Sequence, residues 1–537
     1  MKRKTGYFSP IVKLLRPTFV VRYYLFPVVF LFLCVGVLFA RSNAVVDSRI
    51  LPKWYAFAFG SAALLTTAAV IGLKRKEREP FGNNLDPLFS IPVAACFVQA
   101  LYGLSQYAGL LPALGTFRIT GSFDNPAGFA AALCVGFPFT APLLRNRHRI
   151  VRYLAAIAAM TLILGVILCG SRAGLLSIGT VGMVHGLARI RKPLVRRTMW
   201  VVLPLLLVGL YFLKRESADG RLLVWRCTAE MIARRPLFGH GPGGFAAGYM
   251  NTQADYLREH PDSPYAQLAD SVQHPFNEYL SVAVHYGLFG LMALAALGWG
   301  VVRRYRRTAH GREPAVRATG SCLLSIGVFA LFSYPLFYPF TWTMALFSLW
   351  ILFGKPLPRG WAVRGTAVGL AVGLCVWVVK DWRLQRAWCR TEELAARGNP
   401  SASLSRYREL YPKFVRNRYF LYNFAYVLNE AGEYAEGLAM AEACRGLWAD
   451  YYVELLRGEA ALGLERYDEA ERAFDQAAAM CPNRFMPLYK LVGIYTATGR
   501  EAEARNLAER ILTKEVKIPS ATVTAIRYEM RRLIDTQ

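Results

Sequence analysis

Acidic residues and metal-binding patterns are scarce in this chain of 537 residues. Asp and Glu number 36 against 64 Lys and Arg, which gives a formal net charge of +28. The 10 cysteines are scattered, without a Cys-x-x-Cys pair or the spacing of zinc ligands, and no Asp-x-Asp pattern occurs. The sequence therefore predicts no metal site, no disulfide framework and no cofactor.

The basic excess is not distributed as in a nucleic-acid-binding protein. From Arg390 onward the chain has 21 basic and 21 acidic residues, so the whole excess lies before that point. There it falls in short loops between apolar runs, which is typical of the cytoplasmic loops of a membrane protein. Because no nucleic-acid-binding motif accompanies the charge, we do not expect nucleic acid as a partner.

Long apolar runs dominate the first 380 residues. The sequence is 54% hydrophobic and only 19% charged, and a bilayer span needs about 20 mostly apolar residues. We therefore expect an all-α fold, a polytopic membrane helix bundle of about 11 to 12 spans. The runs assigned as spans are Tyr23–Ala40, Trp54–Leu73, Pro87–Leu110, Ala127–Leu144, Tyr153–Gly170, Gly174–Ala188, Thr198–Leu213, Tyr279–Val302, Ala318–Leu336, Phe340–Phe353 and Gly365–Val379.

The loops between these runs predict the orientation of the chain. The N-terminal segment and every second loop hold 28 Lys and Arg, whereas the alternate loops hold 12. Because positive charge stays on the cytoplasmic side, we expect a cytoplasmic N-terminus. The long loop 214–278 and the C-terminal tail then face outward.

The C-terminal tail differs in amino-acid composition from the membrane region. We divide the chain into a membrane domain, residues 1–380, and a helical repeat domain, residues 390–537. Gly432-Glu433-Tyr434, Glu465-Arg466-Tyr467 and Gly499-Arg500-Glu501 recur at the period of tetratricopeptide repeats, about 33 to 34 residues. Such paired helices serve equally well as a packing or dimerisation module and as a groove for a protein partner.

One polar segment stands directly before the long apolar run Tyr279–Val302. It contains Asp270, His274, Asn277 and Glu278 within nine residues. Ionisable groups at the end of a membrane helix are costly unless they line a hydrated site, so the segment is a candidate functional site.

Further motifs accompany it in the outward loops. They are Gly121-Ser122-Phe123-Asp124-Asn125-Pro126, Ser171-Arg172, Gly220-Arg221-x-x-x-Trp225, Pro236-Leu237-x-Gly239-x-Gly241-x-x-x-Phe245, His274-x-x-Asn277-x-x-Leu280 and Gly287-x-x-Gly290. In this order, they resemble the O-antigen ligase and polymerase superfamily of bacterial membrane glycosyltransferases. The resemblance covers roughly residues 20–355 and implies a polyprenyl-diphosphate-linked glycan as donor. Two positions depart from the pattern: Phe276 stands where many relatives have a second histidine, and His285 where many have a glutamate.

Transfer of a glycan from a lipid diphosphate to a hydroxyl needs charge stabilisation on the diphosphate and a base for the acceptor. Arginine suits the first task because its planar fork binds phosphate oxygens with two hydrogen bonds. Arg172 and Arg221 are the candidates, and the resemblance implies the same two. A lone arginine at a span end is otherwise a snorkelling anchor. His274 is the candidate base; the alternative is a residue that only caps the next helix.

The other polar residues receive supporting roles. Asp270 or Glu278 could orient the imidazole, while Asn277 holds the loop, caps the helix or touches substrate. Asn125 fits a turn and cap before a span, with a donor-glycan contact as the second reading. For the glycines at 239, 241, 243 and 244, a tight turn is favoured over a phosphate-binding nest.

The resemblance implies a bacterial inner membrane, with the long loop and the tail in the periplasm. The leading hypothesis is a metal-independent, inverting glycosyltransferase at the periplasmic face, similar to O-antigen ligases of lipopolysaccharide biosynthesis. Its partners would be an undecaprenyl-type diphosphate donor, a lipid or protein acceptor and membrane lipids, with a possible protein partner at the repeats. Polymerase and protein O-oligosaccharyltransferase activities of the same superfamily remain alternatives. A lipid-linked sugar transporter or a non-catalytic scaffold represents a different class.

Overall fold

The computed structural model describes residues 25–71, 86–187, 209, 215–307, 314–354, 360–398 and 400–536. These stretches are helical with connecting turns, and no strand occurs among them. The chain divides into two compact units, one formed by residues 1–208 and 296–386 and the other by residues 209–295 and 387–537. The all-α prediction is thereby confirmed for the described residues.

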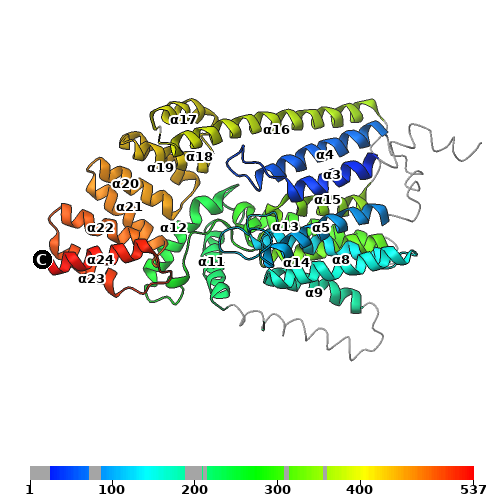
Figure 1. The fold of residues 1–537 in the computed structure, drawn as a ribbon, viewed down its shortest axis with the longest axis horizontal. Coiled ribbons are helices and arrows are strands. Elements are labelled where there is room, and N and C mark those ends of the chain that lie inside the picture. The colour runs from blue at the N-terminus through cyan, green and yellow to red at the C-terminus, as the bar shows by residue number, and fades with distance from the viewer. Residues whose placement is uncertain are drawn as a thin grey trace, which may run out of the picture. The chain divides into compact units, whose positions relative to one another are not determined.

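The first unit is a bundle of apolar helices around an aromatic core (Figure 1). Within it α3 packs on α4 and α5, α5 packs on α6 and α8, and α14 packs on α6, α9 and α15. Phe139, in the short 3-10 helix Phe137–Phe139 after α6, contacts the rings of Phe89 on α5 and Phe347 on α15. Its helices are α3 (Phe26–Phe39), α4 (Leu51–Ile71), α5 (Asp86–Tyr107), α6 (Pro126–Gly136), α7 (Thr140–Leu143), α8 (Arg149–Leu168), α9 (Arg172–Leu187), α14 (Pro314–Ala330) and α15 (Pro339–Phe353).

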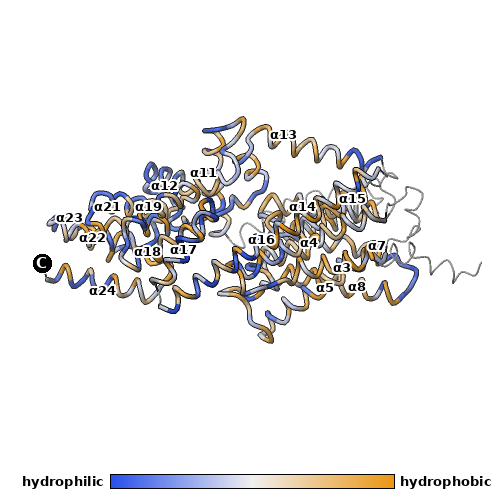
Figure 2. The backbone as a smooth tube through the Cα atoms, turned by 90° about the horizontal axis from the view of Figure 1, so that it is seen from above, coloured by the Kyte–Doolittle hydropathy of each residue, from blue (hydrophilic) through white to orange (hydrophobic). Residues whose placement is uncertain are grey.

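Five helical stretches are long and apolar enough to cross a membrane. They are Pro87–Tyr107, Pro126–Leu143, Arg149–Leu168, Glu278–Arg307 and Trp361–Ala396, with shorter apolar helices beside them. Figure 2 shows the hydrophobic colouring that runs along α3, α5 and α8. The chain is thus suited to a multi-pass membrane protein, as predicted. The predicted span Thr198–Leu213 lies outside the described residues except for Gly209.

The second unit joins the long loop to the C-terminal helices. Loop helix α12 (Gly244–Glu259) packs on α11 (Arg215–Arg234) and also on α19 and α21 of the tail. Helices α13 and α16 (Trp361–Ala396) connect the two units along the chain. The tail helices are α17 (Pro400–Phe414), α18 (Arg418–Glu430), α19 (Tyr434–Leu447), α20 (Tyr451–Gly463), α21 (Tyr467–Met480), α22 (Met486–Ala497), α23 (Glu501–Thr513) and α24 (Ala521–Thr536).

Helix pairing in the tail follows the spacing of small and aromatic residues. α18 packs on α19, α20 on α21, and α22 on α23. Ala470, Phe474 and Ala477 are fully buried on α21. A Cβ atom at Gly458 of α20 would lie 2.6 Å from the Phe474 ring, so this helix crossing requires a glycine. The identity of these pairs as tetratricopeptide repeats stays a prediction.

Helix α13 (Glu278–Arg307) is broken near its first third. Gly287 has φ 59° and ψ −152°, so the helical hydrogen bonding is interrupted there. The predicted span began at Tyr279 and was continuous. The structure differs because a segment 50 residues earlier in the chain supplies the hydrogen bonds that the break removes, as described below.

Candidate functional site

The segment that carries His274 is anchored by helix α11. The indole Nε1 of Trp225 donates to the backbone carbonyl of Pro275 at 2.9 Å. The guanidinium carbon of Arg221 lies 5.3 Å from the ring centre of Phe276, in cation–π geometry. Residues four apart on a helix share one face, so the Gly-Arg-x-x-x-Trp motif lays both side chains on the segment after His274.

Phe276 takes an unusual backbone conformation. Its φ is 51°, one of two positive values found for non-glycine residues in the described chain. Such a conformation costs on the order of 1–3 kcal/mol and persists where the surroundings enforce it. Here the Arg221 contact holds the ring of Phe276, and the Trp225 hydrogen bond holds the carbonyl of the preceding residue, Pro275. The ring of Phe276 thus contacts the guanidinium of Arg221.

Asn277 and Glu278 begin helix α13. The Asn277 side-chain oxygen accepts from the backbone N–H groups of Tyr279 at 2.9 Å and Leu280 at 3.1 Å. It is therefore the N-cap, a role that asparagine fills well because its short side chain reaches these unpaired donors. Glu278 stands in the first helical turn, where a negative charge is favoured by the helix dipole.

His274 is half-buried, and its imidazole is neutral at physiological pH. Burial lowers its pKa from 6.5 to about 4, and the positive charge of Arg418 and the neighbouring His285 act in the same direction. A neutral ring keeps one nitrogen with a lone pair, which is the form that a general base needs. Arg418 belongs to α18, so the C-terminal helices contribute to the electrostatics of this residue.

The glycine-rich turn packs against the break in α13. His240 and Gly241 donate backbone hydrogen bonds to the carbonyls of Val284 (2.7 Å) and His285 (3.0 Å). In return, the N–H groups of Leu288 and Phe289 donate to Pro236 and Leu237. The turn thus forms hydrogen bonds with the backbone groups that the break in α13 leaves unpaired. These contacts support a structural role for the glycines of the turn over a phosphate-binding role.

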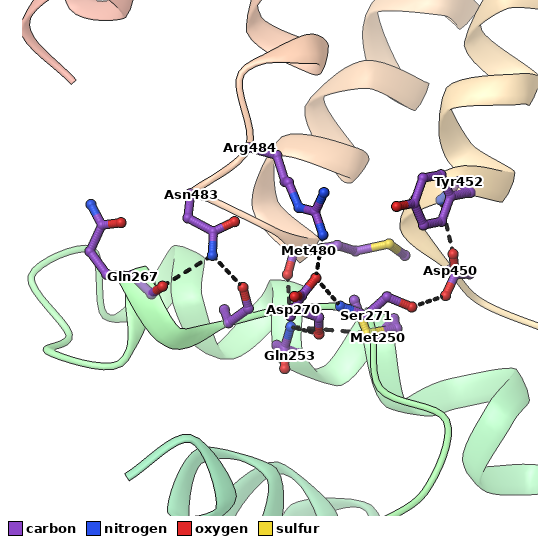
Figure 3. Close-up of polar contacts among 11 residues, drawn as sticks. Met250, Gln253, Gln267, Asp270, Ser271, Asp450, Tyr452, Met480, Asn483 and Arg484 are labelled. Carbon is purple, nitrogen blue, oxygen red and sulfur yellow. Dashed lines mark hydrogen bonds and ion pairs between the residues drawn. The ribbon is translucent and has the colours of Figure 1, made fainter. Parts of the chain in front are cut away.

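Asp270 faces the C-terminal helices. Its carboxylate accepts from Arg484 at 2.8 Å and from the backbone N–H of Ser271 at 2.9 Å (Figure 3). Both hydrogen bonds are accepted by one carboxylate oxygen, Oδ1, which ties Asp270 to the tail. That Asp270 or Glu278 orients the imidazole of His274 stays a prediction.

In the other unit, Asn125 caps α6. Its side-chain oxygen accepts from the N–H groups of Ala127 (2.8 Å) and Gly128 (3.2 Å). Its amide nitrogen donates to Asp124 and to the hydroxyls of Tyr334 (3.2 Å) and Tyr338 (2.9 Å). Both ends of the amide are engaged, which supports the capping reading; a donor-glycan contact stays a prediction. Burial raises the pKa of the neighbouring Asp124.

Arg172 is the first residue of α9. A tight turn precedes it, with Gly170 at φ 66° and the Ser171 hydroxyl accepting from the N–H of Gly174 at 3.1 Å. The turn fixes the guanidinium-bearing residue at the helix start. Arg172 and Asn125 belong to one unit, and Arg221, Asp270, His274, Asn277 and Glu278 belong to the other.

A cavity in the first unit carries two arginines that the sequence did not single out. Its volume is about 260 Å³, and Arg41, Arg49 and Ser122 line it together with Phe39, Val98 and Tyr102. Arg49 also donates to the Phe123 carbonyl at 3.2 Å. Paired guanidinium groups beside apolar side chains suit an anionic head group with a hydrocarbon tail. Their only sequence signal is that they are basic residues in a predicted outward loop.

Comparisons with known proteins address the family. No curated protein matches the chain. Residues 126–295, which run from α6 into α13 and include Arg172, Arg221 and His274, match the family model described as O-antigen ligase. This match supports the resemblance of the chain to the O-antigen ligase superfamily.

Proposed function

We propose that the protein transfers a preassembled glycan from a polyprenyl diphosphate to an acceptor hydroxyl at the periplasmic face of the bacterial inner membrane. The observation that carries the proposal is the junction of two distant motifs. Arg221 and Trp225 of α11 contact the residues directly after His274, so an arginine of this helix lies against the segment that carries the neutral imidazole. The family match over residues 126–295 supports glycosyl transfer of this kind.

In the proposed step, the acceptor oxygen attacks the anomeric carbon while the bond from that carbon to the diphosphate oxygen breaks. The acceptor proton passes to the lone pair of His274. The diphosphate leaves on its polyprenyl carrier, and Arg221 stabilises the charge that develops on it. Arg172 is proposed to bind phosphate oxygens of the donor. A single displacement of this kind inverts the configuration at the anomeric carbon, and no metal ion takes part.

The cavity lined by Arg41 and Arg49 extends the proposal to donor capture. Its mixture of guanidinium groups with Val98 and Tyr102 fits an anionic head group attached to a lipid. We propose that it receives the phosphate oxygens of the incoming donor.

Among acceptors, the lipid A core is the first choice, which would make the protein a ligase. A second lipid-linked glycan (polymerase) and a Ser or Thr of a protein (O-oligosaccharyltransferase) are the alternatives within the superfamily. The acceptor is identified by asking whether glycan appears on lipid A, lengthens as a ladder or decorates protein.

Complementation of a deletion strain tests the proposal, with surface glycan measured on gels and lipid-linked donor by mass spectrometry. His274→Ala and Arg221→Lys are expected to abolish surface glycan and to accumulate donor in the periplasmic leaflet at normal protein level. His260→Ala is the matched control, because His260 lies in the same loop and its imidazole contacts Tyr256 of the preceding helix, through a hydrogen bond of Nδ1 to the carbonyl at 3.0 Å and by stacking of the two rings. Unchanged glycan in both variants would reject catalysis. Donor retained in the cytoplasmic leaflet would favour a transporter.

A further inference from the structure

The C-terminal helices hold the segment that leads to His274 along its whole length. The Asn483 amide donates to the carbonyls of Gln267 (3.0 Å) and Ala269 (2.8 Å), and Arg484 pairs with Asp270. Ser271 donates to Asp450, the N-cap residue of α20 (Figure 3). Residues 267–271 are therefore fixed by three side chains of the tail, all in one compact unit.

Helix α12, just before this segment, is bound in the same way. The buried Gln253 amide donates to the Met480 carbonyl of α21 at 2.8 Å and to the Asp270 carbonyl at 3.3 Å. It thereby joins the loop helix, the tail and the segment before His274 at one point. A fully buried amide of this kind specifies one arrangement, because any other would leave its donors unpaired.

The last anchor lies next to His274 itself. Arg418 donates from Nη2 to the Tyr419 hydroxyl at 2.8 Å, and that hydroxyl donates to the Gln273 side-chain oxygen at 2.9 Å. The Arg418 guanidinium also lies 4.7 Å from the Tyr419 ring centre and 5.6 Å from that of Trp448. A hydrogen-bonded chain thus runs from a cation in the tail to the residue preceding the candidate base.

The position of Arg418 is not explained by helix stability. It is the first residue of α18, where the helix dipole disfavours a positive charge. Asn417 already caps the helix by accepting from the N–H groups of Tyr419 and Phe420, both at 3.1 Å. At this position the guanidinium contacts the rings of Tyr419 and Trp448 and is linked through the Tyr419 hydroxyl to Gln273.

We propose that the C-terminal helices complete the transfer site, with Arg418 and Tyr419 acting through Gln273 as positioning residues for His274. The inference rests on the proposed transfer activity and assigns the tail a role in it beyond partner binding.

Two groups from two helices act on the pKa of His274 besides its burial, and two further charged residues belong to the elements beside its segment. Arg418 of α18 and His285 of α13 both disfavour its protonation. Arg221 of α11 contacts the adjacent Phe276, and Glu278 begins α13. Of these, only Arg418 belongs to the tail, so its removal separates the contribution of the tail from that of the loop.

The first test is a double-mutant cycle on transfer rate with purified full-length protein in lipid nanodiscs. Tyr419→Phe and Gln273→Ala should each lower the rate roughly two- to tenfold, the value of one hydrogen bond. The double variant should lose no more than either single one, because both remove the same contact. Tyr426→Phe, at an exposed tyrosine of the same helix, is the control and should leave the rate unchanged. Additive losses, or none, would overturn the proposal.

The second test measures the imidazole without using activity. Carbethoxylation by diethyl pyrocarbonate, followed on the His274 peptide by mass spectrometry, reports the neutral fraction at each pH. Arg418→Gln should move the midpoint upward toward that of an ordinary histidine, whereas Arg416→Gln, at an exposed neighbour before α18, should not. An unmoved midpoint in Arg418→Gln would refute the role of Arg418. If the midpoint moves but wild-type protein transfers no glycan, the proposed function fails while the coupling of tail and loop stands.

Discussion

Replacement of Gly287 by alanine is expected to destabilise the loop that carries the candidate site. Gly287 has φ 59°, and an L-residue in the left-handed region costs roughly 1–2 kcal/mol. The added Cβ would lie 2.7 Å from the backbone nitrogen of Phe238 and closer still to the Leu237 carbonyl. Neither is the end of a flexible side chain, so the glycine-rich turn itself must move.

That movement breaks the backbone pairing between turn and helix. The hydrogen bonds from Leu288 to Pro236 (2.8 Å) and from Phe289 to Leu237 (3.3 Å) are lost, each worth about 0.5–1.5 kcal/mol. With the conformational cost, the total is about 2–5 kcal/mol.

The assay is the midpoint of thermal unfolding in detergent, followed by tryptophan fluorescence. Gly298→Ala is the matched control, because it lies on the same helix with no atom within 4 Å of the added Cβ. Gly287→Ala should unfold well below wild type and Gly298→Ala should not. Equal midpoints for the two variants would refute the account of the broken helix.

Three further outcomes are expected. Asn277→Ala should cost about 1 kcal/mol by removing the cap of α13, and Asn277→Asp should restore stability; if Asp restores stability but not transfer, the amide also touches substrate. Trp225→Phe, which loses the hydrogen bond to Pro275, should lower the transfer rate more than the unfolding midpoint, and the reverse order would make Trp225 a core residue only. Because the folded-state pKa of His274 is about 4 against 6.5 unfolded, its contribution to stability is complete above about pH 6.5 and declines as the pH falls toward 4. A His274→Gln variant should lack that decline when midpoints at pH 7 and pH 5 are compared.

The sequence predicts the features that depend on neighbouring residues, namely helix caps and apolar helices. The caps at Asn125 and Asn277 follow from short polar side chains directly before apolar helical runs, and the structure uses both as N-caps. The apolar runs likewise predicted helices α5 and α8 and the helical stretch Pro126–Leu143, whose bounds lie within a few residues of the predicted spans. Each of these inferences needs only residues that are close together in the chain.

The sequence does not predict the contacts between residues that are far apart in the chain. The break at Gly287 depends on the turn around Leu237, about 50 residues away, and periodicity cannot reveal such a partner. Asp270 is only four residues from His274 in the sequence, but the arginine that donates a hydrogen bond to its carboxylate, Arg484, is 214 residues away. Nothing in the composition of the tail indicates that the Met480 carbonyl accepts a hydrogen bond from Gln253, which lies 227 residues earlier.

The electrostatics of His274 lead to one more expectation. A base with a pKa near 4 is neutral but weak, since the driving force for accepting a proton falls with its pKa. Its pKa is low because of burial and because positive charge lies nearby, with Arg418 the main charged contributor. A bound diphosphate would offset that positive charge, so the imidazole should become a stronger base only when the donor is in place. Adding inorganic diphosphate should therefore raise the pH midpoint of His274 carbethoxylation, and the rise should be smaller in Arg221→Gln. If the midpoint is the same with and without diphosphate, no anion reaches the surroundings of His274, and the pairing of imidazole and arginine in one transfer site is wrong.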